Sequence, residues 1–191
     1  MRSLPVEIDK KIGELAIETM DLEGGRVTDP LVVGAVEEMV NRLRPHACGE
    51  GFDFQVCVID APVLNAFALP GGPIVVYTEL IEKATEAEQV AGVVGHEMAH
   101  VTLRHGLQRI SGSIGVLAAL ELIMGDATGL MAIGKELLQA GAITSYSREQ
   151  ESQADMEGLR MLHAARIDAT ALARFFDFLQ REQGELPGAV T

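Results

Sequence analysis

The segment VVGHEMAHVTLRH, residues 93–105, places three of the chain's five histidines and one glutamate within thirteen residues. A helix has 3.6 residues per turn, so His96 and His100 lie one above the other on the same face. Two such imidazoles can bind one zinc ion at about 2 Å, and Glu97 beside them can accept a proton from the bound water. This HExxH pattern predicts a helix that carries a metal site. An ordinary helix with incidental histidines is the alternative.

A hydrolytic zinc site needs three protein ligands and one open position for water. His105 is the nearest candidate, but on a continuous helix it faces away from His96 and His100, so we reject it as a ligand. In YSREQESQADMEGLRML, Glu151 shares a helix face with small and apolar residues, where an unpaired carboxylate is costly. We therefore predict Glu151 as the third ligand, although alone it could be a solvated surface charge. Asp155, one turn later, is expected to accept the second ring N–H of His96 or His100.

The remaining histidines and the cysteines carry weaker signals. His46 and His163 have no partner at ligand spacing and are expected at the surface or at its boundary with the core. Cys48 and Cys57 are the only cysteines, and their separation fits either one disulfide or two free thiols. The cysteines therefore leave the compartment of the protein open.

The length of 191 residues favours a single domain over residues 1–191. We expect an α+β fold with a mainly helical, zincin-like core and a small sheet of about three strands. Asp168 is expected to cap the last helix. The predicted elements are two N-terminal helices within 1–47, strands within 51–78 with a turn at Pro70-Gly71-Gly72, and helices over 79–84, 86–107, about 147–165 and 169–183, so that the catalytic helices lie within 86–165.

The net charge of −13 disfavours non-specific binding to nucleic acid or to anionic lipid. No apolar run reaches the roughly 18 residues expected of a membrane-spanning helix. The N-terminus has no apolar signal-peptide core, so we expect that a signal peptide is absent or removed. The apolar, glycine-rich segment 111–143 fits either buried core helices or a surface that contacts lipid, a partner or unfolded polypeptide.

Three blocks of the chain resemble a known family. NAFALPGGPIVVYTELI, VVGHEMAHVTLRHG and YSREQESQADMEGL, within about residues 64–165, resemble the HtpX-like and CAAX-prenyl-endopeptidase family of zinc metallopeptidases. The resemblance is closest to its soluble branch, whose members are periplasmic or mitochondrial proteases. It rests on two separate motifs, HExxH and ExxAD, which occur here in the family's order.

The resemblance implies a gluzincin-type site with one Zn²⁺ per chain, bound by His96, His100 and Glu151, with Glu97 as general base. Asp155 would contact a ligand histidine and not the metal itself. The resemblance also implies that the strands near Asn65, Ala66 and 73–77 border the substrate cleft, where an extended peptide pairs with a sheet edge. It further implies a periplasmic or peripherally membrane-associated protein of the bacterial envelope. Its substrates would be misfolded, membrane or envelope polypeptides.

Relatives usually continue past the last helix with a His-Pro and an Arg-containing segment, whereas this sequence ends at GELPGAVT. The sequence therefore does not identify the residue that stabilises the oxyanion. The candidates near the motifs are Tyr146, Arg148 and His105.

The predicted function is a zinc-dependent endopeptidase of protein quality control that hydrolyses peptide bonds through a metal-activated water. The alternative is a zinc-containing chaperone or assembly factor, with little or latent proteolytic activity, that binds unfolded chains through segment 111–143.

Overall fold

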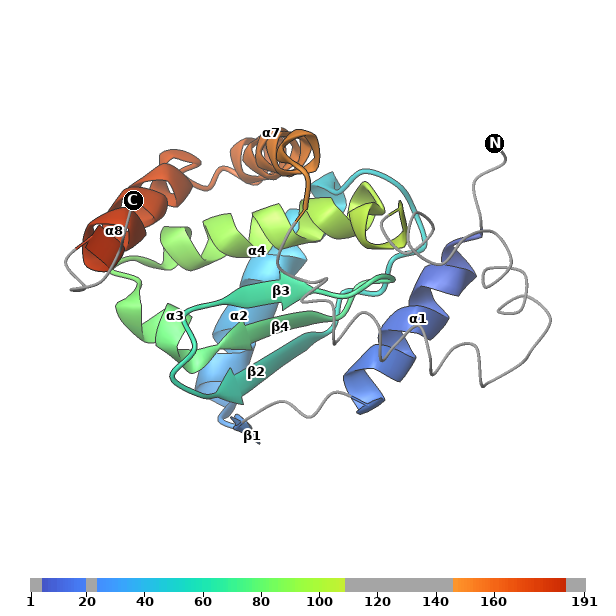
Figure 1. The fold of residues 1–191 in the computed structure, drawn as a ribbon, viewed down its shortest axis with the longest axis horizontal. Coiled ribbons are helices and arrows are strands. Elements are labelled where there is room, and N and C mark those ends of the chain that lie inside the picture. Colours follow the sequence, from blue (N-terminus) through green and yellow to red (C-terminus); the bar gives the residue numbers. More distant parts are fainter. Residues whose placement is uncertain (1–4, 20–23, 109–145, 185–191) are drawn as a thin grey trace.

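A computed structural model describes residues 5–19, 24–108 and 146–184 (Figure 1). Helices predominate in these residues, and one small mixed sheet lies beside them. The predicted α+β fold with a mainly helical core is therefore confirmed.

The sheet has four strands in the order β1-β2-β4-β3. The two central strands, β2 and β4, are parallel, and the outer strands run antiparallel to them. The three strands expected from the sequence are present, and β1 is an additional two-residue strand. The strand bounds are β1 Gly25–Arg26, β2 Val56–Asp60, β3 Ala66–Ala68 and β4 Ile74–Tyr77.

Two of the helices, α2 and α8, begin next to aspartates that accept hydrogen bonds from their first backbone N–H groups. Asp29 accepts a hydrogen bond from Leu31 N at 2.8 Å and starts α2. Asp168 accepts one from Thr170 N at 2.9 Å, as predicted for the last helix, α8. The helix bounds are α1 Val6–Thr19, α2 Pro30–Leu43, α3 Thr78–Lys83, α4 Ala87–Thr102, α7 Arg148–Ala164 and α8 Thr170–Gly184, with a 3₁₀ turn at Arg44–His46.

Helix α4 lies at the centre of the fold, between strand β3 and helix α7, and it also contacts α2 and α8 (Figure 1). Its residues Val94, Met98 and Ala99 are completely buried. A helix packed on so many sides is held rigidly. The HExxH motif is therefore presented from a fixed element of the core.

The prediction of one continuous helix over 86–107 is wrong. Helix α4 ends at Thr102, Arg104 has a positive φ of 58°, and the chain is helical again from His105. A positive φ is unfavourable for a side chain such as that of arginine and needs support from elsewhere. The guanidinium of Arg104 supplies it, because Nη2 lies 2.5 Å from Oδ2 of Asp9 on α1. The helix break thus depends on a contact 95 positions away in the sequence.

Replacing Arg104 with Met is expected to lower the free energy of unfolding at neutral pH by about 3 kcal/mol, because the buried carboxylate of Asp9 would lose its partner. Asp9 is only 1% exposed. Burial raises the pKa of Asp9 above its ordinary 3.8, and Arg104 opposes that rise. A raised folded-state pKa means that the cost of ionised Asp9 appears as the pH rises and disappears below 3.8. The difference in free energy of unfolding between Arg104→Met and the parent should therefore be smaller at acid pH.

Urea unfolding at neutral pH and below 3.8 measures both effects. Arg174→Met is the matched control, since it removes exposed ion pairs with Glu86 and Asp168 and should change the unfolding midpoint little. An Arg104→Met midpoint equal to that of the parent at neutral pH would contradict a supporting role for the pair.

Three further predictions concern membranes and thiols. Segment 111–143 lies outside the described residues. Within the described ranges, every helix is too short or too polar to cross a membrane. Of the two alternatives for the cysteines, the structure has two free thiols, with Cys48 exposed and Cys57 partly buried.

Candidate metal centre

Helices α4 and α7 approach each other closely because small residues lie where they cross. A Cβ atom added at Gly158 would lie 3.1 Å from the backbone nitrogen of His96, and one at Gly95 would lie 3.5 Å from Leu162. The short distance between the two backbones lets carboxylate side chains of α7 reach the histidines of α4. Glycine at residue 158 is therefore part of how this site is built.

The side chains of His96, His100 and Glu151 converge on one point. Their ligand atoms all lie within 4.8 Å of one another. The two Nε2 atoms are 3.0 Å apart, and Oε2 of Glu151 lies 3.3 Å from Nε2 of His96 and 3.8 Å from Nε2 of His100. Tetrahedral zinc with bonds of about 2.0–2.1 Å has ligand atoms about 3.3 Å apart. The three residues therefore fit a zinc ion without rearrangement.

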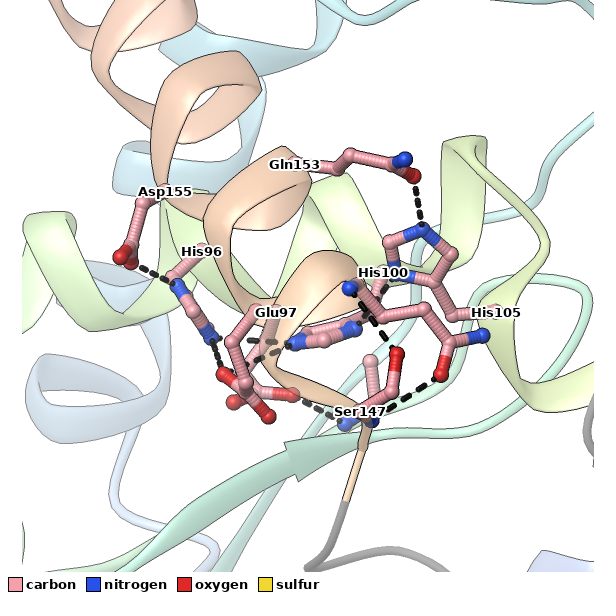
Figure 2. A network of polar contacts seen from close by, with 10 residues as sticks. His96, Glu97, His100, His105, Ser147, Gln153 and Asp155 are labelled. Atoms are coloured by element: carbon pink, nitrogen blue, oxygen red, sulfur yellow. Dashed lines mark hydrogen bonds and ion pairs between the residues drawn. The ribbon is translucent and has the colours of Figure 1, made fainter.

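Asp155 lies on the opposite side of the His96 ring from this point. Its Oδ1 is 2.9 Å from Nδ1 of His96 (Figure 2). A carboxylate accepts hydrogen bonds, so Nδ1 of His96 carries the proton and Nε2 keeps its lone pair. Asp155 thus turns the ring and sets the tautomer that a metal ligand requires.

The environment keeps His100 neutral. Burial, together with the neighbouring rings of His96 and His105, lowers the pKa of His100 to about 3. Tyr146 covers one face of the His100 ring, with ring centroids 3.9 Å apart and an interplanar angle of 17°. A neutral, shielded imidazole is the form that binds metal ions.

Glu97 points to the side of α4 that faces the sheet. Its Oε2 accepts a hydrogen bond from the backbone N–H of Ala68 on β3 at 3.1 Å. Burial, opposed by the Ala68 N–H and reinforced by the nearby Glu151, raises the pKa of Glu97 to about 8. A carboxyl group with a pKa close to neutral is suited to accept and return a proton. Glu97 is therefore fixed beside the converging side chains of His96, His100 and Glu151 without being one of that group.

A cleft of about 290 Å³ opens over these groups. Its polar end contains His96, Glu97, His100 and Glu151. Large apolar side chains form the rest of its wall, together with Asn65, Ala66 and Tyr146. These apolar residues are Leu64, Leu80, Val93, Phe175 and Phe176.

Strand β3 forms one border of this cleft and is an edge of the sheet. Hydrogen bonds of Leu69 N to Pro73 O and of Tyr77 N to Asn65 O join it to β4. Backbone groups alternate in direction along an antiparallel strand, so Ala66 presents its N–H and C=O away from β4. Those groups can pair with an extended chain in the cleft.

The remaining candidates occupy different positions. The prediction that His105 faces away from His100 is wrong, because the end of α4 at Thr102 turns the chain back. His105 is completely buried, and its Nδ1 lies 2.9 Å from Nδ1 of His100. Arg148 is exposed in the first turn of α7.

The hydroxyl of Tyr146 lies near Gly106, where an added Cβ would be 3.9 Å from it. His46 is partly buried in the 3₁₀ turn, and His163 is exposed. Sequence reasoning missed Gln153, whose Oε1 is 3.2 Å from Nε2 of His105. Its spacing carried no signal, because Gln153 meets His105 only through the break after α4.

Several known proteins are similar in sequence to this chain. A family model described as peptidase family M48 matches residues 30–188. The beta-barrel assembly-enhancing protease of Yersinia pestis is 28% identical over 188 residues, which cover 93% of this chain and 38% of that protein. The mitochondrial metalloendopeptidase OMA1 of Arabidopsis thaliana is 31% identical over 143 residues, which cover 73% of this chain and 28% of that protein.

A putative beta-barrel assembly-enhancing protease of Vibrio cholerae is 31% identical over 168 residues, covering 82% of this chain and 34% of that protein. The chain thus spans less than two fifths of the length of each of these three relatives.

Proposed function

Because the chain belongs to peptidase family M48 and is a metallopeptidase, we propose that it is an endopeptidase with one zinc ion per chain, bound by His96, His100 and Glu151. The observation that carries the proposal is the convergence of two imidazoles and one carboxylate at the ligand spacing of tetrahedral zinc. Zinc, as a borderline-soft ion, suits a site with two imidazole nitrogens and one carboxylate oxygen.

When bound, zinc supplies Lewis acidity that polarises a peptide carbonyl and acidifies a water molecule. Glu97 accepts the proton of that water and returns it to the leaving amine. The N–H of Ala68 holds Oε2 of Glu97 in position, so its other oxygen is the one that exchanges the proton. Asp155 keeps His96 oriented while the charge at the site changes.

We further propose that the substrate lies along β3 as an added antiparallel strand. The outward N–H and C=O of Ala66 would pair with its backbone, since they face the cleft beside Glu97. The apolar part of the cleft would accept a large apolar side chain next to the scissile bond. Polypeptides that expose such side chains, as misfolded proteins do, fit this cleft.

The biological role that we propose is quality control of proteins in the bacterial envelope, at a periplasmic or peripheral membrane location. Two of the relatives described above are named for enhancing β-barrel assembly, which supports envelope proteins as substrates. The acidic net charge of −13 fits a partner that is neither nucleic acid nor anionic lipid.

A test of the proposal is reversible removal of the metal. Dialysis against a zinc chelator is expected to abolish cleavage of an unfolded protein, and one equivalent of zinc should restore it. Magnesium, which prefers six oxygen ligands, should not restore it. Gel electrophoresis with mass spectrometry of the fragments measures cleavage, and elemental analysis measures zinc. Cleavage that persists in fully zinc-free protein would contradict the proposal.

A further inference from the structure

His105 is a buried histidine that the proposed reaction does not use. It lies behind His100, on the opposite side of that ring from the converging ligand atoms (Figure 2). Its exposed fraction is 0%, and both of its ring nitrogens have hydrogen-bond partners. A polar ring buried this completely and bonded at both nitrogens is held in one orientation.

The partners of His105 determine where its proton lies. Gln153 places its Nε2 3.3 Å from Oε1 of Glu149, and a carboxylate can only accept, so the amide oxygen of Gln153 is left for His105. Nε2 of His105 therefore donates to that oxygen, and Nδ1 of His105 has a free lone pair. The 2.9 Å contact between the two Nδ1 atoms needs one proton, which His100 must supply. The Nε2 atoms of His96 and His100, 3.0 Å apart, then face each other with two lone pairs, an arrangement that suits a cation held by both.

We propose that His105 is a positioning residue that holds His100 in its Nδ1–H tautomer, so that Nε2 of His100 offers its lone pair to the metal. The hydrogen bonds run outward from His100 through His105 and Gln153 and end at the carboxylate of Glu149. The Nδ1–H of His96 is held in a similar way, by a single hydrogen bond to the carboxylate of Asp155. The inference rests on the proposed function in taking His100 as a metal ligand.

The fold provides for this contact through the break after α4. On a continuous helix His105 would point away from His100, and the positive φ of Arg104 brings it back. The ion pair of Arg104 with Asp9 supports that turn. Helix α7 completes the arrangement, because Glu151 reaches His96 and His100, Gln153 reaches His105, and Asp155 reaches His96.

Two variants of His105 separate its acceptor function from its packing. In His105→Asn the amide oxygen can occupy the position of Nδ1 and accept from His100, whereas His105→Leu places a methyl group there. Both variants lose the bond to Gln153 and have similar size. The zinc dissociation constant, measured by competition with a chromophoric chelator, should rise about 10- to 100-fold in His105→Leu and at most about threefold in His105→Asn.

Nitrogen-15 NMR of the imidazoles gives a readout that does not depend on activity. In the zinc-free parent and in His105→Asn, His100 should be protonated at Nδ1, and in His105→Leu it should lose that preference. Gln153→Leu and Gln153→Glu extend the test at an exposed position, where folding is not at risk. Leucine should weaken zinc binding several-fold by freeing the His105 tautomer, and glutamate, which still accepts, should not.

Equal loss of zinc affinity in His105→Leu and His105→Asn would overturn the proposal, because it would mean that His105 only fills space. A parent in which His100 is protonated at Nε2 would overturn it as well. A parent that binds no zinc but shows the Nδ1–H tautomer would instead contradict the proposed function and leave the role of His105 in the tautomer intact.

Discussion

Glu97→Gln is expected to lower the rate of peptide hydrolysis by about 10³-fold, because the amide cannot accept the proton that general base catalysis requires. Glutamine has the shape of glutamate, and its side-chain oxygen can still accept the N–H of Ala68. The fold and the three metal ligands should therefore be unaffected. Cleavage of an unfolded protein, followed by mass spectrometry, measures the loss, and elemental analysis should find the zinc content of the parent.

The matched control is Glu88→Gln, the same change at an exposed residue in the first turn of α4. It should retain full activity. The same pair of variants separates the enzyme from a non-proteolytic chaperone. If Glu97→Gln supports the physiological role as well as the parent does, the chaperone alternative is correct and the role does not require peptide hydrolysis.

The fold could be predicted where the determinants are local. The proline after Asp29, the alternating strand residues and the glycine-rich turn at 70–72 each follow rules that act within a few residues. Strand β1 has two residues, too few for any periodic pattern. The break at Arg104 was missed for a different reason. Neither glycine nor proline marks it, and the contact with Asp9 that supports it is formed only in the folded chain.

The site also contains residues that local sequence patterns predict and residues that are brought together only in the folded chain. His96 and His100 follow from helical spacing alone, and the predicted face of α7 correctly separated the more exposed Glu149 from Glu151, which shares its face with buried Ala154 and Gly158. The structure brings Asp155 to His96, one of the two histidines that were considered.

The positions of His105 and Gln153 could not be obtained in this way. Both depend on how the chain returns after α4, and helical geometry applied across the break gives the wrong direction.

Glu151→Gln is expected to remove zinc from the protein, while Glu149→Gln, the same change two residues earlier on α7, should not. The carboxylate of Glu151 is the one acidic group among the three proposed ligands, and a neutral amide is not a usual zinc ligand. The loss of zinc affinity should therefore exceed the roughly 10- to 100-fold that is typical when a residue hydrogen-bonded to a metal ligand is replaced. In Glu149→Gln the new amide oxygen can still accept the hydrogen bond from Gln153, so this variant should bind zinc as the parent does.

Thermal unfolding provides a second measurement of the same difference. A ligand that binds only the folded state raises the unfolding temperature with its concentration. Added zinc should raise the midpoint of the parent and of Glu149→Gln, and it should have little effect on Glu151→Gln. Without zinc the three proteins should unfold at similar temperatures, since Glu151 is only partly buried. Equal zinc content and equal zinc-dependent shifts in both variants would mean that Glu151 is not a ligand, and the metal would then need its third protein ligand from another residue.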